Sequence, residues 1–395
     1  MSIYKLNNVI QTYDWGSVTS LHDMFNIDNP QHLPQAEMWM GAHPRGCSKV
    51  VEQDIPLNDL LVRDTPNLLG SYTAARFGEL PYLLKIIAAQ SPLSIQVHPS
   101  KQKAEQGFAR ENRLGIPLDA ANRNFKDANH KPELVYALTF FLALNGFRPI
   151  SEITALFHEI DIETINPLVD ALIQQPNEAG LRDFFSHIMT LCEADKRQAL
   201  QQLSLLVEKP AKSRLSREAF HTIRTLMVHY QDDLGLFAPL LLNIIELAPG
   251  EAMFLHAETP HAYLSGTALE IMANSDNVLR AGLTAKHIDI EQLIENLSLK
   301  TTHASKLIMS PVQKESRLTY PVPVDDFCFD IVFSNPTPQT LYVRSAEVLF
   351  CIDGEVVVET PQQTVTLKKG QSAFVTCDAL SYQFSGNGRL ARAYN

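Results

Sequence analysis

Cysteine is scarce in this chain, and the few cysteines that occur are scattered. They are odd in number and never form a C-x-x-C pair: Cys47, Cys192, Cys328, Cys351 and Cys377. A disulfide framework needs an even set of cysteines, and a cysteine-rich zinc site needs closely spaced ones. The scarcity argues against both, and it fits a reducing, cytoplasmic setting.

Long apolar runs are also missing. The longest candidate, residues 237–248, is interrupted by Asn243 and Glu246, whereas a membrane-spanning helix needs ~18 consecutive apolar residues. The opening residues, MSIYKLNN, lack the apolar segment of a signal peptide. We therefore expect a protein with no membrane partner.

Positive charge is in deficit. Lysine and arginine number 33 against 44 aspartates and glutamates, which leaves a net charge of −11. General affinity for nucleic acid or anionic membranes needs a basic surface, so we expect no nucleic-acid partner. An anionic substrate would have to be held by a few local lysine and arginine side chains.

The length and the hydrophobic pattern predict several modules. The 395 residues exceed what one compact core usually holds, so two or three modules are expected. Residues 101–130 are polar and carry Gly107, Gly115 and Pro117, which predicts a long loop.

The pattern then becomes helical. Residues 149–230 repeat apolar side chains at i, i+4 spacing, and no cluster of chemical groups occurs there, which indicates a helical insertion beside a site. Strands resume at Leu240. Residues 301–322 favour a linker, and residues 324–395 alternate like a small all-β domain.

The stretch PLSIQVHP, residues 92–99, carries the strongest chemical pattern. In an extended strand successive side chains point to opposite faces. Ser94, Gln96 and His98 therefore line up opposite three apolar side chains, and Gln96 and His98 could reach one metal ion together. The alternative is an ordinary amphipathic strand with its polar face in water.

Ionisable side chains gather in two further segments. Lys85 interrupts the apolar strand LPYLLKII, and a lysine inside a core is costly unless it is paired or used, although it can also reach the surface. The motif NHKPE places His130, Lys131 and Glu133 close together. A solvated loop end would explain that cluster if it stood alone.

Both tryptophans lie near the N-terminus, in the segments YDWG and AEMWMGAHP. We expect Trp39 to pack in a core. Trp15 lies in a predicted loop, and loops carry function more often than cores do, so we expect it to face a site. His43, at the end of the second segment, is a further candidate for substrate contact.

Two stretches offset by 120 residues resemble each other: LAPGEAMFLHAETPHAYLSG and LKKGQSAFVTCDALSYQFSG. Leu, Gly, Phe, Ser and Gly match without a gap, which predicts a duplicated β-barrel or jelly-roll element. His256 and His261 of the first copy become Thr376 and Ser381 in the second. Only the first barrel is therefore expected to bind metal.

Four residues form the candidate metal site: Gln96, His98, Glu133 and His261. Two imidazole nitrogens, a carboxylate and an amide oxygen suit Zn²⁺, Fe²⁺, Co²⁺ or Mn²⁺ better than a thiol-loving ion. His256 is the rival of His261, since side chains five apart face opposite sides of a strand. Pro260 predicts a turn that places His261 at a barrel mouth.

Five motifs resemble the type I mannose-6-phosphate isomerases in sequence and order: SIQVHP, NHKPE, PGEAMFL, TPHAYLSG and NSDNVLRAGLT. The resemblance runs from YDWG to the final GRLARAYN and so covers essentially the whole chain. It implies a mainly β fold with an α insertion, made of duplicated cupin-type β-barrels or jelly rolls and a helical domain. It also implies one Zn²⁺ per chain on the four candidate ligands and Arg280 as the active-site arginine.

The resemblance implies the reversible conversion of mannose 6-phosphate to fructose 6-phosphate, a step that feeds mannose and GDP-mannose metabolism. This aldose–ketose isomerisation passes through an enediol, whose oxygen charge a metal or a fixed cation stabilises. Arg280 is a planar donor for phosphate or for the enediolate oxygens. The candidates for substrate contact are Trp15, His43, Ser94, Tyr263 and Lys286.

The base that moves the proton has five candidates: Lys85, His130, Lys131, Glu270 and Asp276. Burial and neighbouring charge can tune any of them towards neutral pH. We favour Lys131 or Lys85 for proton transfer, with His130 assisting ring opening.

The resemblance also implies how the chain is divided. Residues 1–148 and 237–318 are expected to form the catalytic barrel, residues 149–236 the helical insertion, and residues 319–395 a metal-free C-terminal domain that covers it. We expect a monomer.

Two other functions compete with this interpretation. A cupin-type Fe(II) oxygenase also uses two histidines and a carboxylate, but Gln96 as a fourth ligand and the surrounding cations argue against it. A non-catalytic sugar-phosphate-binding protein would keep the barrel. For such a protein the set of Lys85, Lys131, Glu270 and Arg280 would be superfluous.

Overall fold

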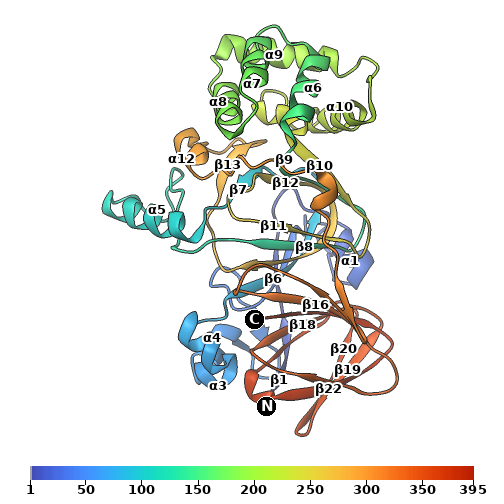
Figure 1. Ribbon diagram of the computed structural model, residues 1–395. Coiled ribbons are helices and arrows are strands. Elements are labelled where there is room, and N and C mark those ends of the chain that lie inside the picture. Colours follow the sequence, from blue (N-terminus) through green and yellow to red (C-terminus); the bar gives the residue numbers. More distant parts are fainter. Residues whose placement is uncertain (1) are drawn as a thin grey trace.

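The structure, a computed structural model, describes residues 2–395. Figure 1 shows three parts stacked along a long axis: a group of helices at one end, a β-barrel in the middle, and a second group of strands at the other end, where both termini lie. Within residues 2–395 no helix is both long and apolar enough to cross a lipid bilayer.

The middle layer is organised around the 13-residue strand β12 (His261–Ala273). Its first part pairs with β7 (Ile95–Val97) and β9 (Phe141–Phe147). Its second part pairs with β6 (Tyr82–Ala89) and β8 (Glu133–Ala137). One strand thus joins two groups of partners and closes them into a barrel.

Gly266 lies where β12 changes partners. Its φ is +109°, and a Cβ at this position would overlap the carbonyl oxygen of Phe140. Only glycine combines this backbone conformation with so close an approach. The bend brings His261 and Glu270, from the two parts of one strand, to the same barrel interior.

The remaining strands of this layer extend the sheet on both sides. Their order is β10-β9-β12-β6-β3-β2, with β11 pairing with β8 and β13 with β7. Their bounds are β2 (Val9–Gln11), β3 (Glu37–Met40), β10 (Leu242–Leu247), β11 (Ala252–Leu255) and β13 (Leu279–Gly282).

The C-terminal part holds a nine-stranded and a four-stranded sheet. The first has the order β14 (Val312–Lys314), β15 (Arg317–Tyr320), β16 (Cys328–Phe333), β23 (Arg389–Tyr394), β18 (Glu347–Asp353), β21 (Ser372–Val375), β1 (Ile3–Asn7), β4 (Lys49–Val50) and β5 (Ile55–Pro56). The second has the order β17 (Gln339–Tyr342), β22 (Ser381–Gly386), β19 (Glu355–Thr360) and β20 (Gln363–Lys368). The first strand of the chain therefore completes a sheet built mainly by its end.

The expected linker at residues 301–322 is only partly a linker. β14 and β15 form a hairpin that pairs with β16. The side chains of β14 are exposed and those of β15 are mostly half-buried, so their sequence has little hydrophobic periodicity. The sequence alone could therefore not distinguish these two edge strands from a linker.

The predicted repeat is confirmed strand by strand. β11 and β21 are offset by 120 residues at both ends, and so are the starts of β12 and β22. The paired glycines Gly250 and Gly370 both have positive φ, as do Gly266 and Gly386. The two matching glycines are thus the residues that the turn and the bend require.

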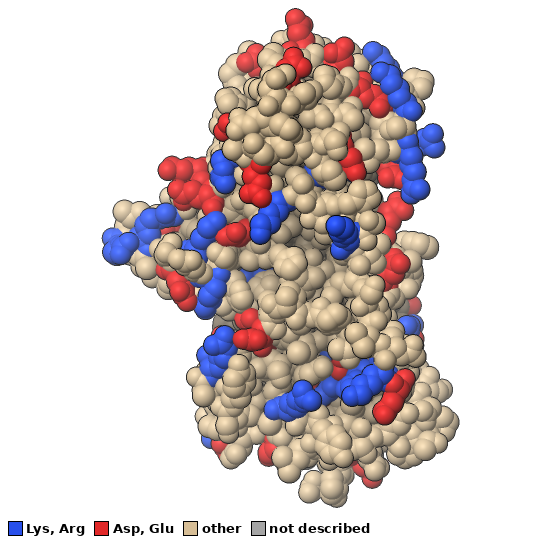
Figure 2. Space-filling view, in the orientation of Figure 1, with Lys and Arg blue, Asp and Glu red and all other residues tan. Residues whose placement is uncertain are grey.

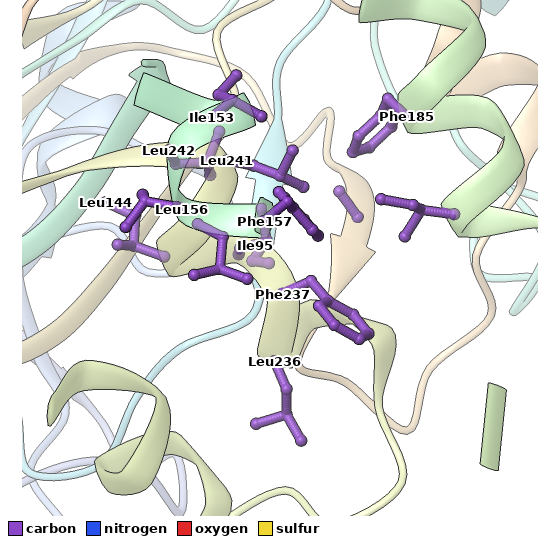
Figure 3. Close-up of a cluster of buried hydrophobic side chains, with 14 of the residues drawn as sticks. Ile95, Leu144, Ile153, Leu156, Phe157, Phe185, Leu236, Phe237, Leu241 and Leu242 are labelled. Atoms are coloured by element: carbon purple, nitrogen blue, oxygen red, sulfur yellow. The ribbon is translucent and has the colours of Figure 1, made fainter. Parts of the chain in front are cut away.

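The helical insertion packs on the outer side of the middle layer. Its elements are α6 (Ile150–Ile160), α7 (Asn166–Gln174), α8 (Glu178–Met189), α9 (Glu193–Leu206), α10 (Arg214–Met227), η1 (Leu234–Phe237) and α11 (Ala238–Leu241). In Figure 3 the helical side chains Phe157, Phe185 and Phe237 surround Ile95 of β7. Because side chains alternate along a strand, the opposite face of β7 carries Gln96.

The prediction of a loop at residues 101–130 is wrong for its first half, because α5 (Lys101–Arg113) forms there. Gly107 lies inside this helix because a Cβ there would come within 2.5 Å of Phe125. Gly107 therefore allows the Phe125 ring to pack closely against the helix, and it does not mark a turn. The other helices are α1 (Ser20–Phe25), α2 (Leu57–Leu61), α3 (Thr65–Leu69), α4 (Ser71–Arg76), α12 (Ile290–Glu295), η2 (Ala304–Lys306) and η3 (Cys377–Ala379).

Candidate metal centre and active site

Three buried side chains converge inside the middle barrel. The ligand atoms of His98, Glu133 and His261 all lie within 4.8 Å of one another. Nε2 of His98 lies 3.4 Å from Oε1 of Glu133, and Nε2 of His261 lies 3.3 Å from Oε2. The ends of β7, β8 and β12 thus bring together three of the four predicted ligands.

The second nitrogen of each imidazole fixes which atom faces the centre. Nδ1 of His98 lies 2.6 Å from the carbonyl oxygen of Asn277, and Nδ1 of His261 lies 2.9 Å from that of Thr259. A carbonyl only accepts, so each Nδ1 carries the proton and donates it. Both Nε2 atoms therefore turn an unprotonated lone pair towards Glu133.

This arrangement fits a zinc ion. Two imidazole lone pairs and a carboxylate are a donor set that Zn²⁺ prefers. Nε2 of His98 is buried and has no hydrogen-bond partner among the described residues. The backbone carbonyls behind both rings act as the outer partners that orient metal-binding histidines.

Gln96, the fourth predicted ligand, lies on the same face of the sheet. It pairs with His261 across β7 and β12 and with Arg280 across β7 and β13. Opposed residues of antiparallel strands present their side chains on one face. The register therefore places the half-buried Gln96 between His261 and Arg280.

His256, the rival of His261, lies outside the group. It is exposed, and its ring packs against the edge of Phe254. This agrees with the prediction that side chains five residues apart cannot reach one site.

A lysine and two carboxylates form a buried network beside the metal ligands. Nζ of Lys85 lies 3.2 Å from Oε2 of Glu270 and 3.8 Å from Oε2 of Glu37. The indole N–H of Trp39 donates to Glu37 at 2.6 Å, and the ring lies under the Lys85 ammonium. Lys85 is thus paired inside the barrel and does not reach the surface.

Lys131 and Tyr263 contact the central carboxylate directly. Nζ of Lys131 lies 2.9 Å from Oε1 of Glu133. The hydroxyl of Tyr263 lies 3.2 Å from Oε2 of Glu133 and 2.8 Å from Oε1 of Glu270. Tyr263 therefore bridges the metal ligands and the Lys85 network.

The surroundings fix the charge of each group. Burial lowers the pKa of His98 to about 4, and Lys131 acts in the same direction. Burial alone would raise the pKa of Glu133, but Lys131 and His98 hold it well below its usual range. Burial opposes the charge of Lys85, yet Glu37 and Glu270 raise its pKa above the usual value. The centre therefore offers neutral imidazole and ionised carboxylate, the forms that bind metal.

Basic side chains gather around Lys286, and the half-buried Arg280 is one of them. Burial lowers the pKa of Lys286, and the nearby charges of Arg280, Lys126 and Arg45 lower it further. On the face shown in Figure 2, Lys and Arg side chains lie on and beside α5, with acidic side chains interspersed. A local group of cations thus exists in a chain whose net charge is −11.

His43 and Asp276 contact each other and not the metal ligands. Oδ1 of Asp276 lies 3.2 Å from the Arg45 guanidinium and 3.8 Å from Nε2 of His43. The backbone N–H of Asp276 donates to Asp127 at 2.7 Å. Asp276 is therefore engaged in holding the turn after β12.

The remaining candidates lie around the site without joining the central group. Nε2 of His130 lies 3.0 Å from Asp326, a residue of the C-terminal part. Trp15 stacks on Tyr13 and packs against the apolar cluster to which Tyr263 belongs. Ser94 precedes β7 and is half-buried.

Glu37 and Lys126 were missed in the sequence. Glu37 is a single acid in an apolar segment, which is the same signal that singled out Lys85. Lys126 lies in the polar stretch after α5, where nothing in the spacing distinguishes it from other surface lysines. Its charge acts on Lys286, which lies 160 residues away in the chain.

Two protein families match the chain. Residues 3–150 match the catalytic domain of phosphomannose isomerase type I, and residues 316–395 match the cupin domain of mannose-6-phosphate isomerase. Among relatives, the mannose-6-phosphate isomerase of Salmonella typhimurium is 47% identical over 99% of both chains. The enzyme of Homo sapiens is 34% identical over 94% of this chain and 93% of its own.

Solved structures resemble the whole chain. A zinc-bound mannose 6-phosphate isomerase superposes with a TM-score of 0.94 at 46% identity, covering 100% of both chains. The apo form from Salmonella typhimurium also has a TM-score of 0.94 at 46% identity, covering 100% of this chain and 99% of its own.

Proposed function

Since the chain belongs to the type I phosphomannose isomerase family, it interconverts mannose 6-phosphate and fructose 6-phosphate, and we propose how its side chains share that reaction. Gln96, His98, Glu133 and His261 hold one zinc ion. The observation that carries the proposal is the convergence of two imidazole lone pairs on Glu133. An iron-dependent oxygenase is set aside because the family is one of isomerases.

The ion supplies positive charge close to oxygen atoms that become negative during the reaction. The protein keeps this charge effective by burying the ligands, since electrostatic attraction is stronger away from water. His98 and His261 are less than 5% exposed, and so is Glu133.

Lys131 moves the proton between the two reacting carbons. Its Nζ lies within the central group, 2.9 Å from Glu133, and its side chain is largely buried. Lys85 is the less suitable base because two carboxylates raise its pKa. We propose that Lys85 stays protonated and donates hydrogen bonds to the enediol oxygens, while Glu270 and Glu37 orient it.

His130 assists opening of the sugar ring. Asp326 holds Nε2 of His130 at 3.0 Å. A carboxylate that fixes one imidazole nitrogen leaves the other free to exchange a proton with the ring oxygen.

Arg280 binds the phosphate group, together with Lys286. Arginine presents a planar pair of donors that matches two phosphate oxygens. Lys126 and Arg45 add positive charge around them. Trp15, Ser94, Tyr263 and His43 line the approach to the sugar, and Asp276 orients Arg45 instead of acting as a base.

The isomerisation can be followed in deuterated water by nuclear magnetic resonance. The pure protein is expected to form fructose 6-phosphate from mannose 6-phosphate, with some deuterium entering at the carbon that receives the proton. Lys131→Met is expected to abolish this conversion, whereas Lys101→Met, which changes an exposed lysine, retains it. Binding of mannose 6-phosphate without conversion would contradict the proposal and support a non-catalytic binding protein.

We further propose that the protein acts as a cytoplasmic monomer that feeds mannose and GDP-mannose metabolism. Residues 1–148 and 237–318 make up most of the catalytic barrel, residues 149–236 the helical insertion, and residues 319–395 most of the metal-free domain that covers it. The strands β1, β4, β5 and β14 depart from this division, since they belong to the nine-stranded sheet of the C-terminal part. Five scattered cysteines support the reducing setting. Light scattering of the pure protein tests the monomer, and a particle of twice the mass would contradict it.

A further inference from the structure

Near its C-terminal end, just before η1, the helical insertion carries an aspartate, Asp233, that holds the segment following Arg280. We propose that Asp233 is a positioning residue, through which the helical insertion fixes Arg280 in the orientation that binds phosphate. This inference rests on the proposed phosphate-binding role of Arg280. It gives the helical insertion a part in substrate binding.

The Asp233 carboxylate accepts three backbone hydrogen bonds. Its Oδ1 accepts from the N–H of Gly235 at 2.7 Å and of Leu283 at 2.9 Å, and its Oδ2 accepts from the N–H of Thr284 at 2.9 Å. Among the described residues, no lysine, arginine or histidine forms an ion pair with it. The amides of the turn are therefore its partners, and such charge-assisted bonds are stronger than neutral ones.

The turn depends on this support because of its backbone. Gly282 has a φ of +135°, and Leu283 has a φ of +53°, a conformation that a leucine rarely adopts. Such a backbone persists only where the surroundings hold it. Here they are Asp233, which binds the amides, and the core of the helical insertion, which buries the Leu283 side chain.

The contact between the two segments is close. A Cβ on Gly282 would lie 2.8 Å from the Cα of Gly235, and a Cβ on Gly235 would lie 2.6 Å from the backbone nitrogen of Leu283. Two glycines thus allow the backbones to meet. The turn cannot shift without moving the end of the helical insertion.

Arg280 lies at the start of this clamped segment. β13 pairs Arg280 with Gln96, and a register irregularity follows before Gly282. Pairing with β7 therefore fixes the backbone at Arg280 itself, and Asp233 fixes the backbone that follows it, at Leu283 and Thr284. A displacement of about 1 Å in a positioning element can cost two orders of magnitude in rate, so the support of this segment matters for substrate binding.

The isosteric variant Asp233→Asn tests the inference in the zinc-loaded protein. An asparagine offers one acceptor and turns an N–H₂ towards amides that can only donate, so the turn loses part of its support. The Michaelis constant for mannose 6-phosphate is expected to rise about tenfold, the effect of losing roughly one such bond, with a smaller change in kcat. Binding of inorganic phosphate, measured by calorimetry, should weaken in parallel.

The matched control is Asp232→Asn. Asp232 is exposed, and within residues 2–395 its one ion pair is with Lys196, at 3.3 Å. The Asp232→Asn variant should retain wild-type kinetics, phosphate binding and zinc content. Asp233→Glu, which keeps the charge, should recover part of the lost affinity.

Hydrogen exchange and a double variant separate positioning from general stability. Asp233→Asn should speed amide exchange in residues 279–286 while the strands of the C-terminal part keep their protection. The double variant Asp233→Asn with Arg280→Ala should lose less phosphate affinity than the two single variants do in sum, since Asp233 acts mainly through Arg280.

Three results would overturn the inference. They are additive losses in the double variant, unchanged phosphate binding in Asp233→Asn, and an equal loss in Asp232→Asn. Phosphate binding and amide exchange need no turnover, so they test Asp233 even if the isomerisation assay fails. A wild-type protein that binds phosphate without converting mannose 6-phosphate would contradict only the proposed function.

Discussion

Gln96 and Arg280 stand opposite each other across β7 and β13, while Gln96 also stands opposite His261 across β12. Three adjacent strands therefore present a metal ligand, an amide and a cation on one face. Because the side-chain period of a strand is two, a slip of one residue in β7 would turn Gln96 to the other side. The register of this short strand thus decides whether Gln96 shares a face with His261 and Arg280.

Arg280→Ala is expected to lower kcat/KM for mannose 6-phosphate by about 10²–10³-fold, because an arginine that pairs with a charged substrate group contributes several kcal/mol. Metal analysis should find the same zinc content as in the wild type, since Arg280 is not among the ligands. The exposed Arg113 offers the control, and Arg113→Ala should have unchanged kinetics. Loss of zinc in Arg280→Ala would show instead that this arginine is structural.

Lys85→Met is expected to destabilise the protein by about 3–5 kcal/mol, because it leaves the buried Glu37 and Glu270 without their cation. Urea unfolding measures this change. Adding Glu37→Gln to Lys85→Met should recover part of the stability, since one unpaired charge is removed. If the single variant unfolds at the wild-type urea concentration, Lys85 does not hold the network together.

The stability of the protein should depend on pH through His43. Burial lowers the pKa of His43 below its usual value of 6.5. The unfolded chain therefore takes up a proton near pH 6.5, whereas the folded protein does so only at lower pH. The free energy of unfolding contributed by this residue is fully present above pH 6.5 and falls as the pH is lowered.

Urea unfolding of His43→Gln between pH 5 and pH 8 measures this contribution. The variant should lose less stability than the wild type as the pH is lowered. His287→Gln changes an exposed histidine and serves as the control. Parallel curves for the wild type and His43→Gln would contradict the assignment.

Arg392→Met tests the role of the C-terminal part. Arg392 is buried and pairs with Glu347 and with Asp330, at 3.0 Å from the latter. Its removal leaves the buried Glu347 without its cation and leaves Asp330 paired with Arg317 at 3.7 Å, and it should cost about 3–5 kcal/mol. Below the melting temperature, zinc content and KM should be unchanged, because the contacts of Arg392 lie within the C-terminal part and include neither the metal ligands nor Asp326.

Arg389→Met is the matched control for Arg392→Met, since Arg389 pairs with Asp353 near the surface and should contribute much less. A change in KM that accompanies Arg392→Met would mean that the C-terminal part also shapes the active site.

The metal ligands could be predicted because their signal is local. Alternation within PLSIQVHP places Gln96 and His98 on one face, and the five-residue spacing of His256 and His261 allows only one of these two to join the site. The motifs shared with the isomerase family then supplied Glu133. Elements with a strong period, such as β6 and the helical insertion, were predictable for the same reason.

Other features depend on contacts that spacing cannot reveal. α5 was predicted as a loop because Gly107 resembles a turn signal, although it is a packing position against Phe125. The clamp of Asp233 on Leu283 joins residues 50 positions apart through backbone amides, which carry no sequence signal. The pairing of β1 with β21 joins the two ends of the chain.

The central claim is that His98, Glu133 and His261 hold a zinc ion that the isomerisation requires. The most direct measurement is the conversion of mannose 6-phosphate to fructose 6-phosphate before chelation, after chelation and after zinc is added back, with the bound metal counted each time. The account predicts one zinc per chain, loss of activity with the metal and recovery with its return. Full activity in a metal-free protein would contradict it.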